Sequence, residues 1–410
     1  MNLTPVEIDA IHVGQPLPFS LLSENGTLLA IKGYVIKQRE ELDTLTLQRS
    51  KLYIDITESE SHRRAYMSKL NSMVLDDKEL GKIAQTGIAP IVPNEARDKV
   101  LTNSTGWLDL QDEAHLILRD TKSSGFLHRL IKLKNELDRQ LKQNPDGTLF
   151  ALNHLASTEI MRYSATHSML VGVVCALAAR DVLKWPQQHI DSLFFAALSM
   201  NIGMTELHDR LTIQKESPSA DQLRVIEVHA AMSRDILVGF GVSDSNWLEA
   251  VLHHRTKLPG PLNKHGEGDR MARLIQRADM FAAKISPRAS RVPDSQASAM
   301  QSCYFDENRQ LDEAGAALLK AVGIYSPGTF VKLKSNEIAI VVKRGRNTTM
   351  PRVAVLVNRQ GMPTGEPIMR ETSLAEFRIV ASVPIRDVKV SHNLERLLHL
   401  TKTQTSDRPW

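Results

Sequence analysis

The longest run of helical periodicity, from Leu149 to about Arg288, constrains the fold of this chain most. Apolar residues recur there at three- and four-residue intervals, which is typical of helices that bury one face. The segment Phe195–Met204 is apolar on nearly all sides, so we expect that helix at the centre. Ser219 followed by Gln222 has the spacing of a capping box and predicts a helix that runs past His229. The sequence therefore predicts a mainly α protein built around a helical bundle.

A small β-rich α+β unit is expected near the N-terminus. The apolar runs Leu17–Leu22 and Thr27–Ile31 flank Asn25-Gly26, a dipeptide that favours the tight turn of a hairpin. A helical stretch near Gln38–Gln48 and a strand over Leu52–Ile56 complete the unit.

The chain returns to β-like segments after Gly323, and these predict a short C-terminal β extension: Phe330–Leu333, Glu337–Lys343 and Arg352–Val357. We therefore divide the chain into an N-terminal β-rich accessory unit, a linker with a connecting helix, a helical domain, the β extension and a flexible tail, at residues 1–60, 61–148, 149–322, 323–400 and 401–410.

The connecting segment predicts one long helix from about Asp109 to Leu141. Five apolar residues share one of its faces: Leu127, Leu130, Ile131, Leu137 and Leu141. Such a stripe more often packs on the next domain, and a homodimer through this helix is the alternative.

Composition narrows the class of protein. The 410 residues carry a net charge of only +4, with basic and acidic residues interleaved, so we expect no nucleic-acid polymer as partner. The two cysteines, Cys175 and Cys303, lie far apart and fit a reducing cytosol. We see neither a signal peptide nor a membrane span and predict a cytoplasmic protein.

Five potential metal ligands fall on predicted helices of the bundle: His167, His229, His253, His254 and Asp279. Imidazole and carboxylate groups are donors that iron, manganese and zinc sites use. Donors on the inward faces of separate helices can converge in the centre of a bundle. Any one of them alone is more often a hydrogen-bonded core residue, and spacing by itself leaves both interpretations open.

The order of several motifs resembles that of bacterial HD-GYP proteins. These motifs are Tyr163–Ser168, Ala196–Gly203, the lone His229, the pair His253-His254, Arg277–Ala282 and Gly323–Leu333. The resemblance covers about Leu149 to Val383, and the unit at 11–56 also looks like a piece found in some of these proteins. It implies a helical HD-type domain that hydrolyses cyclic di-GMP with water activated by a dinuclear metal centre.

The chain departs from this family at the pair that names it. Met200-Asn201 stands where the family has His-Asp, whose Asp bridges the two metals. Methionine offers a soft, neutral sulfur and asparagine a neutral amide oxygen, so the anionic bridge is lost. A metal-bound hydroxide needs that charge-rich cluster to lower the pKa of water.

Other departures agree with this loss. Met204 replaces the family's lysine, and Arg162 stands where an acidic ligand is expected; we predict that Arg162 points into the old metal site. The loop Arg255–Leu262 lacks the GYP signature. The literal dipeptide His208-Asp209 falls after the landmark Ile202-Gly203 and is interpreted as a coincidental surface pair.

The resemblance and its departures predict a degenerate, inactive signalling protein. We assign no catalytic residue and expect it to act as a cyclic di-GMP sensor or to dock signalling proteins such as diguanylate cyclases, with Arg255 and Lys257 as ligand-binding candidates. No cofactor is the leading expectation; one divalent iron, manganese or zinc ion, held by the five ligands above, is the alternative. The alternative functions are a metal-dependent phosphodiesterase with a mononuclear centre and a scaffold that binds no nucleotide.

Overall fold

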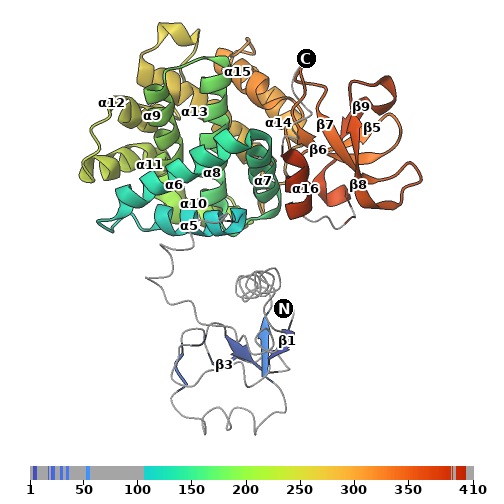
Figure 1. Cartoon of the computed structure of the whole chain (residues 1–410). Helices are drawn as coiled ribbons and strands as arrows, with labels where there is room; N and C mark the ends of the chain where they lie inside the picture. The colour runs from blue at the N-terminus through green and yellow to red at the C-terminus, as the bar shows by residue number, and fades with distance from the viewer. Residues whose placement is uncertain are drawn as a thin grey trace. The chain divides into compact units, whose positions relative to one another are not determined.

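The computed structural model of the chain describes residues 3–6, 17, 20–23, 28–30, 34–36, 52–55, 106–388, 390 and 394–402 (Figure 1). The chain forms two compact units, Met1–Thr105 and Gly106–Trp410. The division between them falls inside the segment predicted as a linker. The predicted boundaries around the helical domain stay predictions, because the second unit also contains the C-terminal sheet.

The N-terminal unit contains a four-stranded sheet in the order β1-β4-β2-β3. Its strands are β1 (Leu3–Val6), β2 (Leu21–Leu22), β3 (Leu28–Ala30) and β4 (Leu52–Asp55). The antiparallel pairing of β2 with β3 confirms the two predicted strands of a hairpin. The predicted turn at Asn25-Gly26 and the helix near Gln38–Gln48 lie outside the described residues.

The second unit begins with a helical bundle, which confirms the predicted mainly α architecture (Figure 1). Its helices are α5 (Trp107–Arg119), α6 (Phe126–Gln143), α7 (Pro145–Thr158), α8 (Tyr163–Leu177), η2 (Ala178–Val182), α9 (Gln187–Ser199), η3 (Ile202–Met204), α10 (Thr205–Ile213), α11 (Ala220–Gly239), α12 (Ser245–His253), η4 (Leu262–Lys264), α13 (Glu267–Ile285), α14 (Gln296–Cys303) and α15 (Glu313–Val322). The predicted capping box at Ser219 and Gln222 is present at the start of α11.

The centre of the bundle is α8, every residue of which is buried. We expected the helix at Phe195–Met204 there; α9 is indeed largely buried and packs on α8. Among the described residues, one helical stretch, Tyr163–Val182, is long and apolar enough to cross a membrane, and 83% of its apolar window is buried inside the protein. That burial is typical of a core helix.

The prediction of one continuous helix from Asp109 to Leu141 is wrong. The chain leaves the helix at Asp120 and re-enters it at Phe126, so α5 and α6 are separate helices. Leu130, Leu137 and Leu141 lie in the main hydrophobic core. Most of the apolar stripe therefore packs within the chain, although Ile131 is exposed, and a homodimer through this helix stays a prediction.

A five-stranded antiparallel sheet in the order β8-β7-β6-β5-β9 follows, as the β-like segments predicted. Its strands are β5 (Phe330–Leu333), β6 (Ile338–Lys343), β7 (Arg352–Val357), β8 (Pro363–Glu371) and β9 (Ile379–Ser382), and the short helices η5 (Ala375–Phe377) and η6 (Ile385–Asp387) flank β9. The helix α16 (Leu394–Thr401), which the sequence did not predict, packs on α7 and β6.

The sheet is joined to the bundle through a close approach to α7. The amide of Asn153 donates hydrogen bonds to Ser326 Oγ and to the Pro327 carbonyl. Gly328 follows with a φ of 93°, and a Cβ there would lie 3.1 Å from Asn153 Cβ. Both the left-handed backbone and the tight packing favour glycine at this position.

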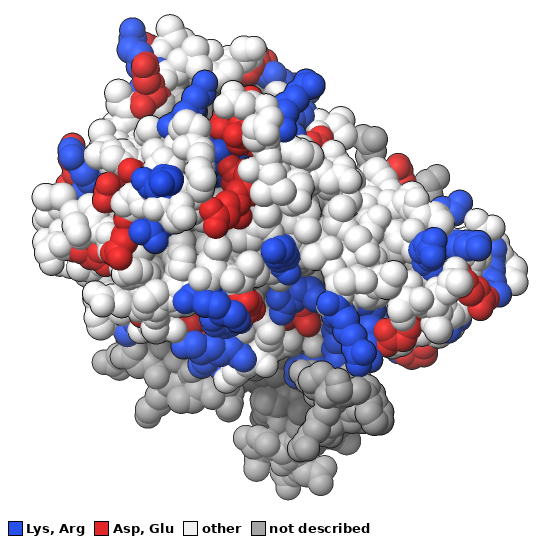
Figure 2. Space-filling model, turned by 90° about the horizontal axis from the view of Figure 1, so that it is seen from above, with Lys and Arg blue, Asp and Glu red and all other residues white. Residues whose placement is uncertain are grey.

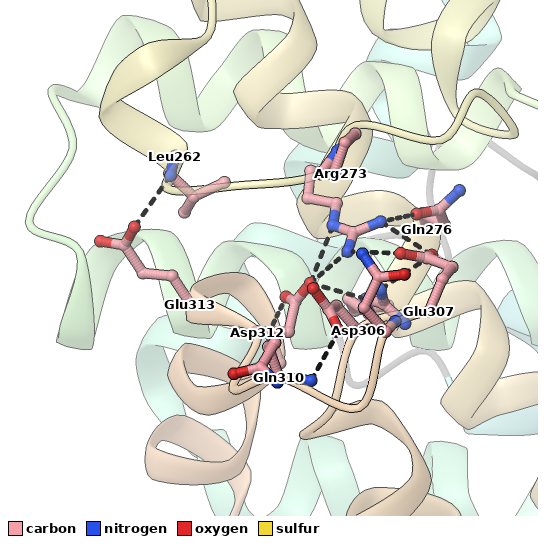
Figure 3. Close-up of polar contacts among 12 residues, drawn as sticks. Leu262, Arg273, Gln276, Asp306, Glu307, Gln310, Asp312 and Glu313 are labelled. Atoms are coloured by element: carbon pink, nitrogen blue, oxygen red, sulfur yellow. Dashed lines mark hydrogen bonds and ion pairs between the residues drawn. The ribbon is translucent and has the colours of Figure 1, made fainter.

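Two buried arginines on α13 form a network with the loop before α15 (Figure 3). Asp312 accepts hydrogen bonds from Arg273 and, at 3.1 Å, from Arg277. Glu307 accepts from Arg273 at 3.0 Å and from Arg277 at 3.0 Å. Asp312 also caps α15 by accepting from Gly315 N at 2.8 Å. Two positive and two negative charges thus cancel at the junction of α13 and α15.

We expect Asp312→Ala to lower the free energy of unfolding by about 3–5 kcal/mol, because it removes one of the two carboxylates that neutralise the buried Arg273 and Arg277 and also removes a helix cap. Urea unfolding measures the change. The matched control is Glu376→Ala, which removes the exposed pair Arg359–Glu376 and should cost less than about 1 kcal/mol. Equal effects of the two substitutions would contradict a structural role of the network.

The network also predicts a pH dependence. Hydrogen bonds from Arg273 are the main cause that lowers the pKa of Glu307 from 4.5 to about 2. A carboxyl with a depressed folded-state pKa stabilises the fold above its unfolded pKa, and the contribution disappears as the pH falls towards the folded value. Stability should therefore fall less steeply for Glu307→Gln than for wild type between pH 4.5 and about 2 in urea unfolding series. Parallel curves would refute this assignment.

Candidate functional site

Two histidines from neighbouring helices face each other at the centre of the site. His229 Nε2 on α11 lies 3.2 Å from His254 Nε2, at the end of α12. The Nδ1 atom of His229 lies 2.6 Å from the Ile226 carbonyl, and that of His254 lies 2.7 Å from the Val251 carbonyl. A carbonyl oxygen only accepts, so each Nδ1 carries the proton and donates it. Both Nε2 atoms are then bare lone pairs directed at one another.

This pair has the geometry of two ligands on one metal ion. Burial is the main cause that lowers the pKa of His229 to about 4, and burial likewise lowers the pKa of His254, so neither ring holds a second proton at neutral pH. Two nitrogen ligands, each about 2.0–2.1 Å from a zinc ion, lie about 2.8–3.4 Å apart for angles between a right angle and the tetrahedral value. The observed 3.2 Å falls in that range.

A second pair of donors joins α8 to α13. His167 Nε2 lies 2.6 Å from Asp279 Oδ1, and the Asp279 side chain is partly buried. Desolvation alone would raise the pKa of Asp279, but the hydrogen bond from His167 and the nearby histidines outweigh it and hold the pKa well below its usual value. His167 Nδ1 is buried without a partner.

The two pairs lie within electrostatic reach of each other, since the charge of Asp279 acts on the pKa of both His229 and His254. Four of the five predicted ligands are therefore grouped around one region of the bundle. Within the part of the chain that the structure describes, no three of their donor atoms lie within 4.8 Å of one another. The site is thus two adjacent ligand pairs.

His253 does not join this group. Its Nδ1 lies 2.7 Å from Asp269 Oδ1 on α13, on the outer side of α12. Adjacent residues of a helix point about 100° apart, because one turn takes 3.6 residues. One of the two neighbouring histidines therefore turns inward and the other outward.

Met200 and Asn201 do not supply the imidazole and carboxylate ligands of a His-Asp pair. Met200 is fully buried in the apolar core. The side-chain amide of Asn201 makes no hydrogen bond among the described residues, while its backbone carbonyl accepts from Met204 N at 2.9 Å. Among the four inward donors, Asp279 is the one carboxylate.

The interpretation of His208-Asp209 as a surface pair is wrong. Both side chains are buried. The ring of His208 lies 4.7 Å from the ring of Tyr163 and 5.3 Å from that of His167, measured between centroids. Asp209 Oδ1 accepts from Ser164 N at 2.8 Å and so holds the start of α8. The missed signal is the spacing of Thr205, His208, Asp209 and Thr212, which is that of one buried helix face.

The three basic candidates lie in two places. Arg162 pairs with Asp112 of α5, with Nε 2.5 Å from Oδ1, and does not point into the cluster as predicted. Arg255 and Lys257 are exposed on the loop between α12 and α13. The charge of Arg255 contributes to the lowered pKa of His229, so this guanidinium lies near the cluster.

The loop at 254–266 lies on the surface and does not fill the interior. Leu262 is its buried anchor, and the Leu262 amide donates to Glu313 Oε2 at 2.9 Å (Figure 3). Gln276 Nε2 donates to the Thr256 carbonyl at 3.1 Å. Most residues of this loop are therefore exposed, whereas His229 and His254 are buried beneath the surface.

No family model matches the chain. The chain is 23% identical over 244 residues to the cyclic di-GMP phosphodiesterase PA4108 of Pseudomonas aeruginosa, a match that covers 58% of this chain and 58% of that protein. Among solved structures, Bd1817, an HDG"Y"P protein from Bdellovibrio bacteriovorus, aligns with a TM-score of 0.41 and 15% identity over 77% of this chain and 98% of that one. The sequence match and the ordered motifs make the chain a relative of the HD-GYP family.

Proposed function

We propose that this protein is a degenerate HD-GYP-like signalling protein that binds cyclic di-GMP or a related ligand and does not hydrolyse it. The observation that carries the proposal is Met200-Asn201, a core methionine and a neutral amide where the family places an imidazole and a bridging carboxylate. Loss of the bridge removes the group that holds two metal ions close enough to share a water molecule.

Charge balance supports the loss of a dinuclear centre. Two divalent ions carry four positive charges, and the inward donors supply one carboxylate, Asp279, and three imidazoles, which carry no negative charge. Buried charge without compensation is costly, so a second ion gains little from this site. A single ion fits much better.

The exposed loop supports ligand binding. Arg255 and Lys257 are exposed on the loop that follows His254, and the charge of Arg255 acts on His229; charges of this kind suit the phosphates of a cyclic dinucleotide. On the face shown in Figure 2, basic and acidic side chains are interspersed with uncharged ones. A nucleic-acid polymer would call for a continuous basic surface, so this pattern agrees better with a small ligand. In a second version of this proposal, the protein acts by docking a cytoplasmic signalling protein such as a diguanylate cyclase.

A mononuclear phosphodiesterase is the second candidate function, favoured by the facing lone pairs of His229 and His254. These two residues, with Asp279 or His167, would hold an iron, manganese or zinc ion. Such an ion supplies Lewis-acid polarisation of a phosphoryl oxygen and a lowered pKa of bound water. The chain's own contribution would be to orient the imidazoles through the Ile226 and Val251 carbonyls.

We expect no hydrolysis of cyclic di-GMP by the purified full chain with iron, manganese or zinc, because the bridging carboxylate is missing. Chromatography of the nucleotide after long incubation measures this. Turnover that is abolished in His254→Ala but kept in the distant surface variant Lys332→Ala would overturn the proposal and establish the mononuclear enzyme.

Binding of cyclic di-GMP should weaken about two- to fivefold in Arg255→Ala and in Lys257→Ala, the range expected for loss of one exposed charge contact. Isothermal titration calorimetry at fixed ionic strength measures the change. Lys332→Ala removes an exposed lysine on β5 and should leave the affinity unchanged. Absence of heat at any cyclic di-GMP concentration with the wild-type chain would favour the alternative that the protein is a scaffold that binds no nucleotide.

A further inference from the structure

We propose that Glu249, His253 and Asp269 form a second site, on the outer side of α12 and α13, that binds one divalent cation of the zinc class. One donor atom from each of the three residues lies within 4.8 Å of the other two, a grouping found once among the described residues. Glu249 and His253 are four residues apart on α12 and share a face, and Asp269 lies in the first turn of α13. The site is separate from the inward pairs, to which His253 contributes nothing.

Gly268 allows Glu249 to reach this group. A Cβ on Gly268 would lie 2.4 Å from Glu249 Oε2 and 2.6 Å from Glu249 Cβ, so any other residue would displace that side chain. The absence of a side chain lets the carboxylate lie against the start of α13, beside Asp269. The backbone thus provides a cradle for one ligand of the proposed site.

The charges of the group call for a cation. Two carboxylates lie beside one imidazole, and the Glu249 carboxylate makes no ion pair or hydrogen bond with any described residue. The neighbouring Glu267 carboxylate interacts with Asn246 and His189. It brings no positive charge that could neutralise Glu249 and Asp269. A divalent ion would neutralise both carboxylates, which otherwise repel each other.

The donor set points to zinc or a similar borderline ion. One imidazole nitrogen and two carboxylate oxygens are common ligands of zinc, and three protein ligands leave a fourth position for water or for a ligand. The side chains of His253 and Asp269 are 34% and 24% exposed, so an ion can enter from solvent without opening the fold.

Occupancy of this site would join the two ends of the loop at 254–266. His253 is the last residue of α12, and Asp269 stands at the start of α13. Arg255 and Lys257 lie on the loop between them. A bound ion would therefore fix the ends of the segment that carries the ligand-binding candidates.

Zinc titration of the chelator-treated full chain by calorimetry tests the site. We expect Glu249→Gln, His253→Ala and Asp269→Asn each to abolish one binding event or to weaken it by at least about tenfold. Glu267→Gln, which changes a neighbouring carboxylate outside the group, should bind like wild type. All four residues are partly exposed, so circular dichroism should show folded variants; if His253→Ala does not fold, Glu249→Gln decides.

His254→Ala separates this proposal from the function of the inward cluster. It should leave the outer binding event intact and affect only zinc bound by the inward histidines. Unchanged zinc stoichiometry and affinity in both Glu249→Gln and His253→Ala would overturn the outer site, whatever the result for cyclic di-GMP. Cyclic di-GMP hydrolysis by the wild type would overturn the proposed function and leave the outer site standing.

Discussion

The buried charge network on α13 fixes the helix on which both candidate sites depend. Arg273 and Arg277 are neutralised by Asp312 and Glu307, which tie α13 to the loop before α15. Burying two guanidinium groups is unfavourable unless every charge is paired, so this junction tolerates little movement. The same helix carries Asp279 towards the interior. Arg273 therefore serves to hold the helix in place.

The inward histidines are oriented by the backbone and do not depend on the lost His-Asp pair. His229 and His254 each donate Nδ1–H to a carbonyl three residues earlier in the chain, at Ile226 and Val251. A protein can therefore lose the bridging carboxylate and keep imidazoles aimed at one point. The orientation of both imidazoles therefore rests on local backbone contacts in α11 and α12.

The sequence predicted what local periodicity controls and missed what tertiary contacts control. Apolar spacing located the bundle, and of the five candidate ligands His167 pairs with Asp279 and His229 with His254. His208 was missed because its buried helix face is polar and carries no hydrophobic signal. The break after Arg119 was missed because leucines continue on both sides of it. α16 was missed because its partners, α7 and β6, lie far away in sequence.

The divergence of His253 and His254 links the two sites physically. Neighbouring residues of a helix cannot both face one interior point, so the end of α12 delivers one imidazole inward and one outward. The inward imidazole, His254, faces the ring nitrogen of His229 and lies within electrostatic reach of Asp279. The outward imidazole, His253, lies beside two carboxylates. The loop that follows carries Arg255 and Lys257 and is anchored at Leu262. An ion bound by either histidine would therefore hold the end of α12, and this is where the loop that carries Arg255 and Lys257 begins.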